Sequence, residues 1–252
     1  MRKQDNPLRN RAMLPEKKRS FRVIAGMATQ PTRSHTAPLA IRRLLPQVDL
    51  LILHLDGFGW VPEWAIHPKI LLDSFTDRSP LGAEGKLIAH EYGAPNDLIL
   101  VVDDDVCLPR DIVGRIIKEL DSLPGKSVVG VHGSVLRRDL TSYVRDREVT
   151  HLHQRLGNLK QVDVVSTCVA GYYRRNFNPN FRSWEHKNMV DLQFAIDAQV
   201  QNVSPWLLPR KKNWVRFYEE KQPDSIYLKL TEDDITQTVL ARQLLERQSD
   251  YA

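Results

Sequence analysis

The spacing of apolar residues in the first half of the chain predicts alternating strands and helices. Five apolar runs have the length of single strands, at 21–28, 50–55, 70–73, 98–102 and 127–132. Helices are predicted between them at about 37–45, at 82–91, where a glycine-bearing loop over 82–86 begins the helix, and at about 110–120. Because the order strand, helix, strand favours parallel pairing with a right-handed crossover, this pattern indicates an α/β fold.

The second half of the chain is less regular. Four elements are predicted in chain order: an extended region at 134–173, a helix at 189–201, a short strand at 206–208 and a polar, basic loop at 209–224. A last helix is predicted from Thr231 to about Arg247, with Thr231 as its cap and Asp234 as its third residue in a variant of the capping box.

The length of 252 residues suits one large α/β domain. We expect this domain to occupy residues 21–230, with a regular half at 21–133 and an irregular half at 134–230. A basic tail at 1–20 precedes it, and a C-terminal helix at 231–252 follows it.

The net charge of +5 is concentrated in the basic tail. Residues 1–20 hold seven of the 36 basic side chains and two of the 31 acidic ones, so the other 232 residues carry 29 of each sign. A basic tail on a neutral body favours weak contact with anionic membrane lipid, or a disordered leader. It argues against a dedicated nucleic-acid groove, so no nucleic-acid partner is expected.

The cysteines and the longest apolar runs indicate the compartment. Cys107 and Cys168 match no metal-ligand spacing, and we expect both to be buried thiols in a reducing environment. No apolar run approaches the about 20 residues that span a bilayer, and the N-terminus lacks the apolar core of a signal peptide. A cytoplasmic protein is expected, at most peripheral at the inner face of the membrane.

Three consecutive carboxylates, Asp103 to Asp105, directly follow the apolar run at 98–102. Adjacent carboxylates repel one another unless a cation screens them, and hard divalent ions such as Mg²⁺ or Mn²⁺ prefer oxygen ligands. Side chains alternate in an extended segment, so Asp103 and Asp105 can converge on one ion while Asp104 points elsewhere. The alternative is a solvated acidic turn before the next helix, whose start Pro109 and Asp111 indicate.

An ordered set of motifs resembles a known family. In chain order these are Ala28–Arg33, Leu55–Gly57, Gly85–Lys86, Val101–Asp105 with Pro109, Val129–Gly133 and Asn188–Ala195. The set is similar to nucleotide-sugar-dependent glycosyltransferases of the GT-A fold, and within them to family-2-like bacterial enzymes that build surface polysaccharides. The likeness covers about residues 21–216. It implies a GT-A-like, Rossmann-like fold with a mostly parallel central sheet flanked by helices and a smaller irregular acceptor-side region.

The resemblance also implies an activity and its cofactor. The chain is expected to move a sugar, with inversion, from a nucleoside diphosphate donor, by preference a UDP-sugar, to a glycan or glycolipid acceptor. Residues 21–133 then form the donor half, and 134–230 the acceptor and catalytic half. Asp103 and Asp105 would hold Mn²⁺ or Mg²⁺, because the departing diphosphate accumulates negative charge that a metal stabilises.

Further donor-side residues follow from the same resemblance, namely Thr29, Pro31, Arg33, Asp56, Lys86, Asp103 and Asp104. Thr29, Pro31 and Arg33 would contact the base and ribose. Asp56 would contact the base, although Asp-Gly is also an ordinary turn pair. Lys86 would offset diphosphate charge, the alternative being a surface lysine at a helix start.

On the acceptor side, the resemblance implies that Asp191 is the general base that takes the proton of the attacking hydroxyl. The alternative is structural: Asn188 caps the helix, and Asp191 as its third residue favours the helix dipole. Glu185 is the nearest substitute for the base. His186 and Trp184 are expected to line the acceptor site.

Other features have weaker chemical implications. His151 and His153 face one side of a strand but lack a third ligand, which indicates a surface pair. The basic stretch 210–216 could fold over the diphosphate, or it could be solvated charge.

Two other classes of function remain as alternatives. A phosphohydrolase of the haloacid dehalogenase type also carries Asp-x-Asp after a strand, but it needs the motif after the first strand and Thr or Val where Cys107 stands. A non-catalytic nucleic-acid-binding module would use the basic tail, with the carboxylates as structure.

Overall fold

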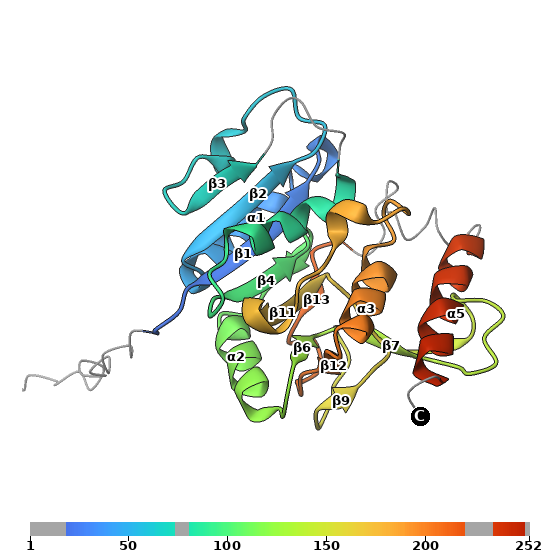
Figure 1. The fold of residues 1–252 in the computed structure, drawn as a ribbon. Coiled ribbons are helices and arrows are strands. Elements are labelled where there is room, and N and C mark those ends of the chain that lie inside the picture. The colour runs from blue at the N-terminus through green and yellow to red at the C-terminus, as the bar shows by residue number, and fades with distance from the viewer. Residues whose placement is uncertain (1–18, 74–80, 220–233, 250–252) are drawn as a thin grey trace, which may run out of the picture.

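An eight-stranded sheet forms the centre of the structure, a computed structural model that describes residues 19–73, 81–219 and 234–249 (Figure 1). The strands follow one another across the sheet as β3 (Ile70–Asp73), β2 (Leu50–Leu55), β1 (Val23–Thr29), β4 (Leu98–Val102), β11 (Val169–Tyr173), β6 (Ser127–Gly130), β12 (Ser204–Leu207) and β9 (Lys160–Gln161). Six run in one direction, and only β11 and β9 among these eight oppose them. The predicted α/β class with a mostly parallel sheet is therefore confirmed.

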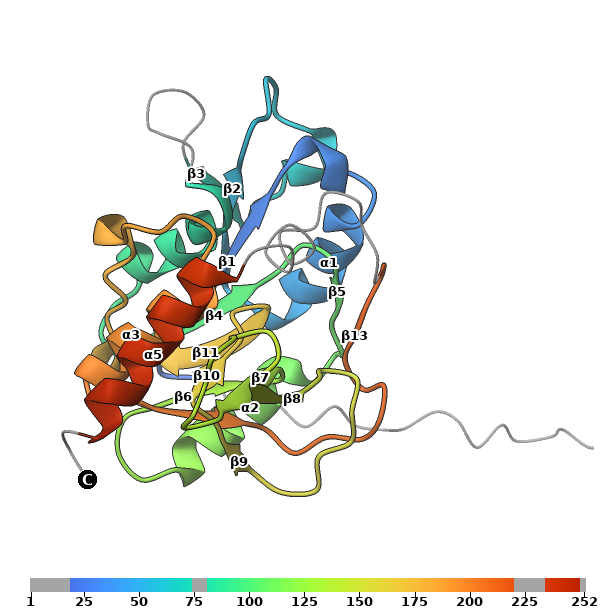
Figure 2. The same cartoon turned by 90° about the vertical axis from the view of Figure 1, so that its right-hand side faces the viewer.

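Helices cover both faces of the sheet, because its strands are apolar on both sides. On one face, α1 (Ala37–Leu44) and α2 (Ile112–Ser122) pack their apolar stripes on alternate residues of β1 and β4. On the other face lie the 3₁₀ segment η4 (Gly82–Tyr92) and α3 (Val190–Val200). The final helix α5 (Ile235–Ser249) packs outside α3 (Figure 2).

Two small sheets flank the central one. One consists of β10 (Val164–Val165), β7 (Gly133–Leu136) and β8 (Arg147–Thr150), all antiparallel. The other pairs β13 (Arg216–Phe217) with β5 (Val106–Cys107), the strand that directly follows the three aspartates. Short 3₁₀ turns complete the described chain at Pro31–Arg33, Leu45–Gln47, Glu63–Ala65, Arg174–Asn176 and Phe181–Ser183.

Several predicted elements differ in detail from the structure. The helix expected at 82–91 is 3₁₀ throughout, and it lies directly on β1 and β2. A Cβ at Gly26 of β1 would come within 1.8 Å of the Lys86 carbonyl oxygen, and one at Gly85 within 2.3 Å of the His54 ring. Glycine at both positions permits this close approach, which periodicity does not reveal.

The predicted ends of the second half also need correction. Part of the loop expected at 209–224 is the strand β13, because its backbone pairs with β5. The helix α5 begins at Ile235, so Asp234 precedes it and is not its third residue. The Asp234 carboxylate instead accepts hydrogen bonds from the Ser142 hydroxyl at 2.6 Å and from the Val144 N–H at 3.0 Å. Thr231, residues 220–224 and most of the basic tail lie outside the described residues.

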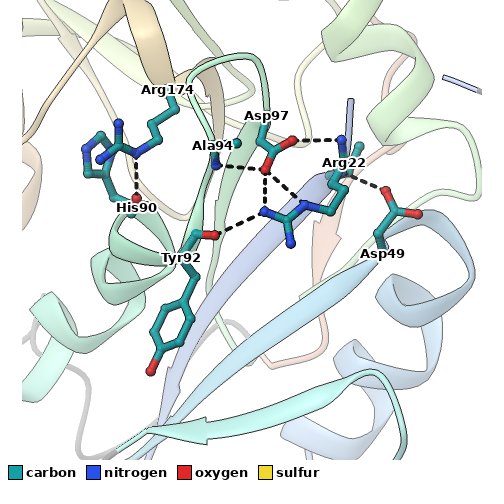
Figure 3. Close-up of polar contacts among 8 residues, drawn as sticks. Arg22, Asp49, His90, Tyr92, Ala94, Asp97 and Arg174 are labelled. Atoms are coloured by element: carbon teal, nitrogen blue, oxygen red, sulfur yellow. Dashed lines mark hydrogen bonds and ion pairs between the residues drawn. The ribbon is translucent and has the colours of Figure 1, made fainter. Parts of the chain in front are cut away.

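The amino ends of β1 and β4 are joined by a buried carboxylate (Figure 3). Asp97 accepts the N–H groups of Arg22 and Ala94, both at 2.9 Å, and two guanidinium bonds from Arg22 at 3.0 and 2.7 Å. Its side chain is 5% exposed, whereas that of Arg22 is 52% exposed. Burial raises the pKa of Asp97, but the hydrogen bonds from Ala94 and Arg22 outweigh it, so the pKa is lowered.

Replacing Asp97 with alanine is expected to lower the free energy of unfolding by about 2–4 kcal/mol, because two buried backbone N–H groups lose their acceptor. A folded-state pKa below the ordinary 3.8 means that this stabilisation is present above that pH and is lost as the pH falls through the lower folded-state value. Urea unfolding at pH 7 measures the difference. The control is Asp139→Ala, which removes an exposed pair with Arg137 and should leave the free energy of unfolding almost unchanged. Equal stability of the Asp97 variant and the wild type would contradict this role.

Candidate active site at the carboxyl edge of the sheet

The carboxyl ends of β1, β2 and β4 meet at one edge of the sheet, as expected for neighbouring parallel strands. Thr29 ends β1, Asp56 follows β2, and the three aspartates follow β4. The N–H of Asp56 donates to the Thr29 carbonyl at 2.8 Å, which fixes the two loops side by side. The structure therefore brings these donor-side candidates together.

Each of the three aspartates has a different environment. Asp103 is partly exposed, and its Oδ1 lies 2.5 Å from the Lys86 ammonium. Asp104 is buried beside the Thr29 hydroxyl, although without a hydrogen bond of normal geometry. Asp105 has a buried Oδ1 that finds no hydrogen-bond partner within the described part of the chain. The alternative of a freely solvated acidic turn is wrong for Asp104 and Asp105.

Burial, and after it the nearness of other carboxylates, raises the pKa values of Asp104 and Asp105. Burial, opposed by Thr29 and reinforced by Asp103, raises the pKa of Asp104 to about 6. Burial and the charges of Asp103 and Asp104 raise the pKa of Asp105 to about 7. Arg33 and Lys86 lower both values, but not enough to offset burial. The three carboxylates outnumber the two basic groups that face them, Arg33 and Lys86, and such an excess of carboxylate is typical of a cation site.

Lys86 lies on η4 with its side chain almost fully buried. Burial lowers the pKa of its ammonium, but the charges of Asp103 and Asp191 outweigh this effect, and the pKa is raised. The lysine is thus a fixed positive charge against the acidic edge. The alternative of a surface lysine at a helix start is wrong.

The remaining donor-side candidates lie around the same edge. Arg33 is 8% exposed and lowers the pKa values of Asp104 and Asp105, so its guanidinium faces the acidic group. Pro31 is exposed and lies next to Gly57. Gly57 has a φ of 70°, which confirms a turn after β2, and Asp56 is partly exposed on that turn. Their contacts with a nucleotide stay predictions.

Asp191 reaches the same region from α3. Its Oδ1 accepts the Thr167 N–H at 2.8 Å and the Thr167 hydroxyl at 2.6 Å, which orients the carboxylate. It is the second helical residue, not the third, because the N-cap is Met189. The expected cap, Asn188, lies one residue earlier in the left-handed region, with φ 63°, and its N–H donates to Glu84 Oε1 at 2.6 Å.

The acceptor-side candidates before α3 are less directly connected. The Trp184 indole N–H donates to Asp197 at 2.9 Å, and its ring packs on the core between the sheet and α3. Glu185 and His186 are exposed. A packing role accounts for Trp184, and the acceptor contacts of these three residues stay predictions.

Sequence reasoning missed several residues of the site. Thr167 holds Asp191, Glu84 holds the backbone of Asn188, and the buried ring of His54 packs on Gly85 beneath the loop that carries Lys86. Burial lowers the pKa of His54, although Asp56 and Asp73 raise it, which indicates a neutral ring. Thr167 lies on a loop, Glu84 on η4 and His54 inside β2, and none of them belongs to a recognisable catalytic motif, so no sequence signal identifies them.

The described residues contain no group of three or more His, Cys, Asp or Glu side chains that could hold an ion. Neither the three aspartates nor the pair His151 and His153 therefore belongs to a complete metal site built by the protein alone. The oxygen donors Asp103 and the unpartnered Asp105 nevertheless fit a hard cation that takes its other ligands from substrate and water. Mg²⁺ is commonly bound in this way, by one or two carboxylates together with substrate phosphates.

Other features limit the alternatives. The aspartates follow the fourth strand in chain order, so the first-strand position required of a haloacid dehalogenase-type phosphohydrolase is not met.

Both cysteines are free, Cys168 buried as expected but Cys107 partly exposed. Arg210 of the basic stretch is buried and bound to backbone carbonyls, so it does not close over this edge. Within the residues that the structure describes, no helix is both long and apolar enough to cross a bilayer.

The sequence matches no model of a known protein family and no curated protein. Among solved structures, the chain is similar to a mannosyltransferase from Pyrobaculum calidifontis in complex with GDP-Man and Mn²⁺, at 15% identity and a TM-score of 0.41, over 73% of this chain and 56% of that one. It is also similar to 4-diphosphocytidyl-2C-methyl-D-erythritolsynthase from Anaerococcus prevotii DSM 20548, at 10% identity and a TM-score of 0.43, over 90% of this chain and 99% of that one. This chain thus spans little more than half of the mannosyltransferase. Likeness at these levels assigns neither activity to it.

Proposed function

We propose that the chain is a metal-dependent glycosyltransferase of GT-A-like fold that moves a sugar from a nucleoside diphosphate donor, by preference a UDP-sugar, to a glycan or glycolipid acceptor. The observation that supports it most is the excess of buried carboxylate at the end of β4, next to Lys86 and Arg33. A cation bound there would meet a diphosphate flanked by two basic side chains. As part of this proposal, the protein acts in surface polysaccharide synthesis, in the cytoplasm or at the inner face of the membrane.

The donor is held by the loops after β1, β2 and β4. Asp103 and Asp105 would hold Mn²⁺ or Mg²⁺, which supplies positive charge to the departing diphosphate. Arg33 adds a guanidinium that suits phosphate oxygens. Lys86 holds Asp103 in place through an ion pair of 2.5 Å. Thr29, Pro31 and Asp56 form the rim for the base and ribose.

The transfer needs one base and one electrophile. The acceptor O–H gives its proton to Asp191 as its oxygen bonds to the anomeric carbon, and the bond from that carbon to the diphosphate oxygen breaks. Thr167 occupies Oδ1 of Asp191, so Oδ2 is the atom assigned to the proton. Direct displacement of this kind inverts the anomeric centre.

Thermal unfolding with a panel of nucleotides and nucleotide sugars, with and without Mn²⁺, tests the proposal. A nucleotide at about a hundredfold its Kd should raise the melting temperature by about 5–10 °C, and EDTA should abolish the effect. The shift should grow between pH 6 and pH 8, because the pKa values of Asp104 and Asp105 are raised to about 6 and about 7 and metal binding requires ionised carboxylates.

The released product distinguishes sugar transfer from nucleotidyl transfer. Release of a nucleoside diphosphate from a nucleotide sugar supports the proposed glycosyltransferase. Release of pyrophosphate from a nucleoside triphosphate would instead show a nucleotidyltransferase. The absence of any metal-dependent nucleotide stabilisation would refute both.

A further inference from the structure

A second group of charged side chains lies beside Asp191, on the acceptor side of the proposed site. His132 follows β6, which runs parallel to β4 and so ends at the same edge of the sheet. The Ser166 N–H donates to the His132 carbonyl at 2.8 Å, and the next residue, Thr167, holds Asp191. The backbone therefore places His132 next to the proposed base.

Basic side chains gather around His132 from β8, from the loop after β8 and from the segment after β12. The β7–β8 register pairs Leu136 with Arg147 and Ser134 with Val149, so the next pair on that face is His132 with His151. Their ring centroids are 5.4 Å apart, and the His153 ring stacks on His151 at 5.5 Å. We call His132, Arg147, His151, His153 and Arg210 the cationic cluster, after its two guanidinium groups.

Two members of the cationic cluster, Arg147 and Arg210, are guanidinium groups that form no ion pair with a carboxylate of the described residues. Arg210 is 3% exposed and donates to the carbonyls of His151, Leu152 and Leu208, which fixes its position but does not neutralise its charge. Burial lowers its pKa to about 10, so it stays charged at neutral pH. Buried charges are normally paired, so this arrangement leaves positive potential unbalanced.

Arg147 is the member best placed to bind. Its guanidinium carbon lies 3.9 Å from the centre of the Tyr143 ring, and its buried Nε makes no hydrogen bond within the described residues. The Nδ1 atom of His132 is also buried and without a partner there. Glu148, the residue that follows Arg147 in the chain, forms its ion pair with Lys160, at 2.6 Å. Buried polar atoms are nearly always hydrogen-bonded in native proteins, so these two atoms are available to a water molecule or a ligand.

Burial is the main cause of the lowered pKa values of His132 and His151, and nearby basic groups add to it. Burial, with His151, Arg147 and Arg210, lowers the pKa of His132 to about 4, although Asp191 raises it. Burial, with His153 and Arg147, also lowers the pKa of His151. Both rings are therefore neutral near pH 7, and a neutral imidazole can donate one N–H to an anion without adding charge.

We propose that the cationic cluster, through Arg147 and His132, binds an oxyanion carried by the acceptor and so presents the adjacent acceptor hydroxyl to Asp191. This inference rests on the proposed function and deepens it, because it names the acceptor class: a glycan or glycolipid with a phosphate or carboxylate near the reacting hydroxyl. Arg147 is the principal ligand, since a guanidinium fork matches both groups. Asp191 would repel an oxyanion, so in this arrangement it faces the acceptor hydroxyl, and the oxyanion lies against Arg147.

Binding of inorganic phosphate and of acetate to the metal-free full chain, in EDTA and without nucleotide, tests the inference. Sodium chloride at equal ionic strength is the reference. One of the two anions should raise the melting temperature of the wild type, and its apparent Kd should weaken at least about tenfold in Arg147→Gln. Preference for phosphate assigns a phosphorylated acceptor, and preference for acetate assigns a carboxylate-bearing one.

Matched variants separate binding from folding and from the donor site. Arg155→Gln removes an exposed positive charge from the same region and should bind the anion as the wild type does. Arg147→Lys keeps the charge and should recover part of the affinity. Stabilisation by UDP and Mn²⁺ should be unchanged in Arg147→Gln, even though anion binding is lost.

Three results would overturn the inference: no anion effect beyond that of chloride, equal anion affinity in Arg147→Gln and the wild type, or loss of UDP and Mn²⁺ stabilisation together with anion binding. Anion binding without any nucleotide effect would leave the oxyanion site standing and remove the glycosyltransferase. The two proposals therefore fail separately.

Discussion

Asp105→Asn is expected to lower the turnover of nucleotide sugar by at least about a hundredfold, because the loss of one metal carboxylate removes several kcal/mol of stabilisation from the departing diphosphate. The change keeps the size of the side chain and removes a charge whose burial is unfavourable, so the fold should remain intact. Steady-state rates with saturating Mn²⁺ measure the first effect, and thermal unfolding measures the second.

The same variant has a distinct pH signature. The pKa of Asp105 in the folded protein is raised to about 7 from 3.8, so between these values the folded state binds more protons than the unfolded state. Relative to Asp105→Asn, the metal-free wild type should therefore lose stability as the pH rises from about 4 to 7. At pH 8 the variant should be at least as stable as the wild type.

Asp139→Asn is the matched control for Asp105→Asn, since Asp139 is exposed and pairs only with Arg137 in the contacts of the described chain. It should retain full turnover. A fully active Asp105→Asn enzyme, or one whose activity falls only because it unfolds, would remove Asp105 from the proposed metal site.

Asp191→Asn is expected to reduce kcat by about 10²–10⁴-fold, the usual contribution of a general base, with little change in donor affinity. Asparagine can still accept the two Thr167 hydrogen bonds, so the start of α3 should keep its geometry. Rapid-quench or steady-state kinetics gives kcat, and nucleotide titration with Mn²⁺ gives donor affinity.

A positioning variant sharpens the assignment of Asp191. Thr167→Val removes the hydroxyl bond but leaves the backbone N–H bond to Asp191, so kcat should fall less than in Asp191→Asn. An Asp191→Asn enzyme with unaltered turnover would show that Asp191 serves only to begin the helix, and Glu185 would become the next candidate for the base.

The central sheet was predictable because its strands are continuous apolar runs that both faces bury. β3 and β4 lie at the expected residues, and the ends of β1 and β6 differ from the predicted ones by at most two residues. The acidic end of β4 was equally visible, since three carboxylates after a buried strand stand out in any sequence. Those signals are local, and local signals suffice for elements and for a motif.

The wrong or missing predictions depend on contacts between distant segments. The 3₁₀ form of η4 follows from its close approach to β1 at Gly26, and β13 exists because β5 provides a partner strand. The cationic cluster joins β8, the loops beyond it and the segment after β12, and its polar atoms are notable only because they are buried without partners. Burial and pairing are properties of the fold, which spacing along the chain does not encode.

A manganese anomalous difference map from crystals of the chain grown with Mn²⁺ and UDP tests the central claim most directly. The expected result is one strong peak bonded to carboxylate oxygens of Asp103 and Asp105 and to the diphosphate, at about 2.0–2.3 Å, the range of hard divalent ions with oxygen ligands. A bound nucleotide with no metal at the end of β4, or manganese held only elsewhere, such as at His151 and His153, would contradict it.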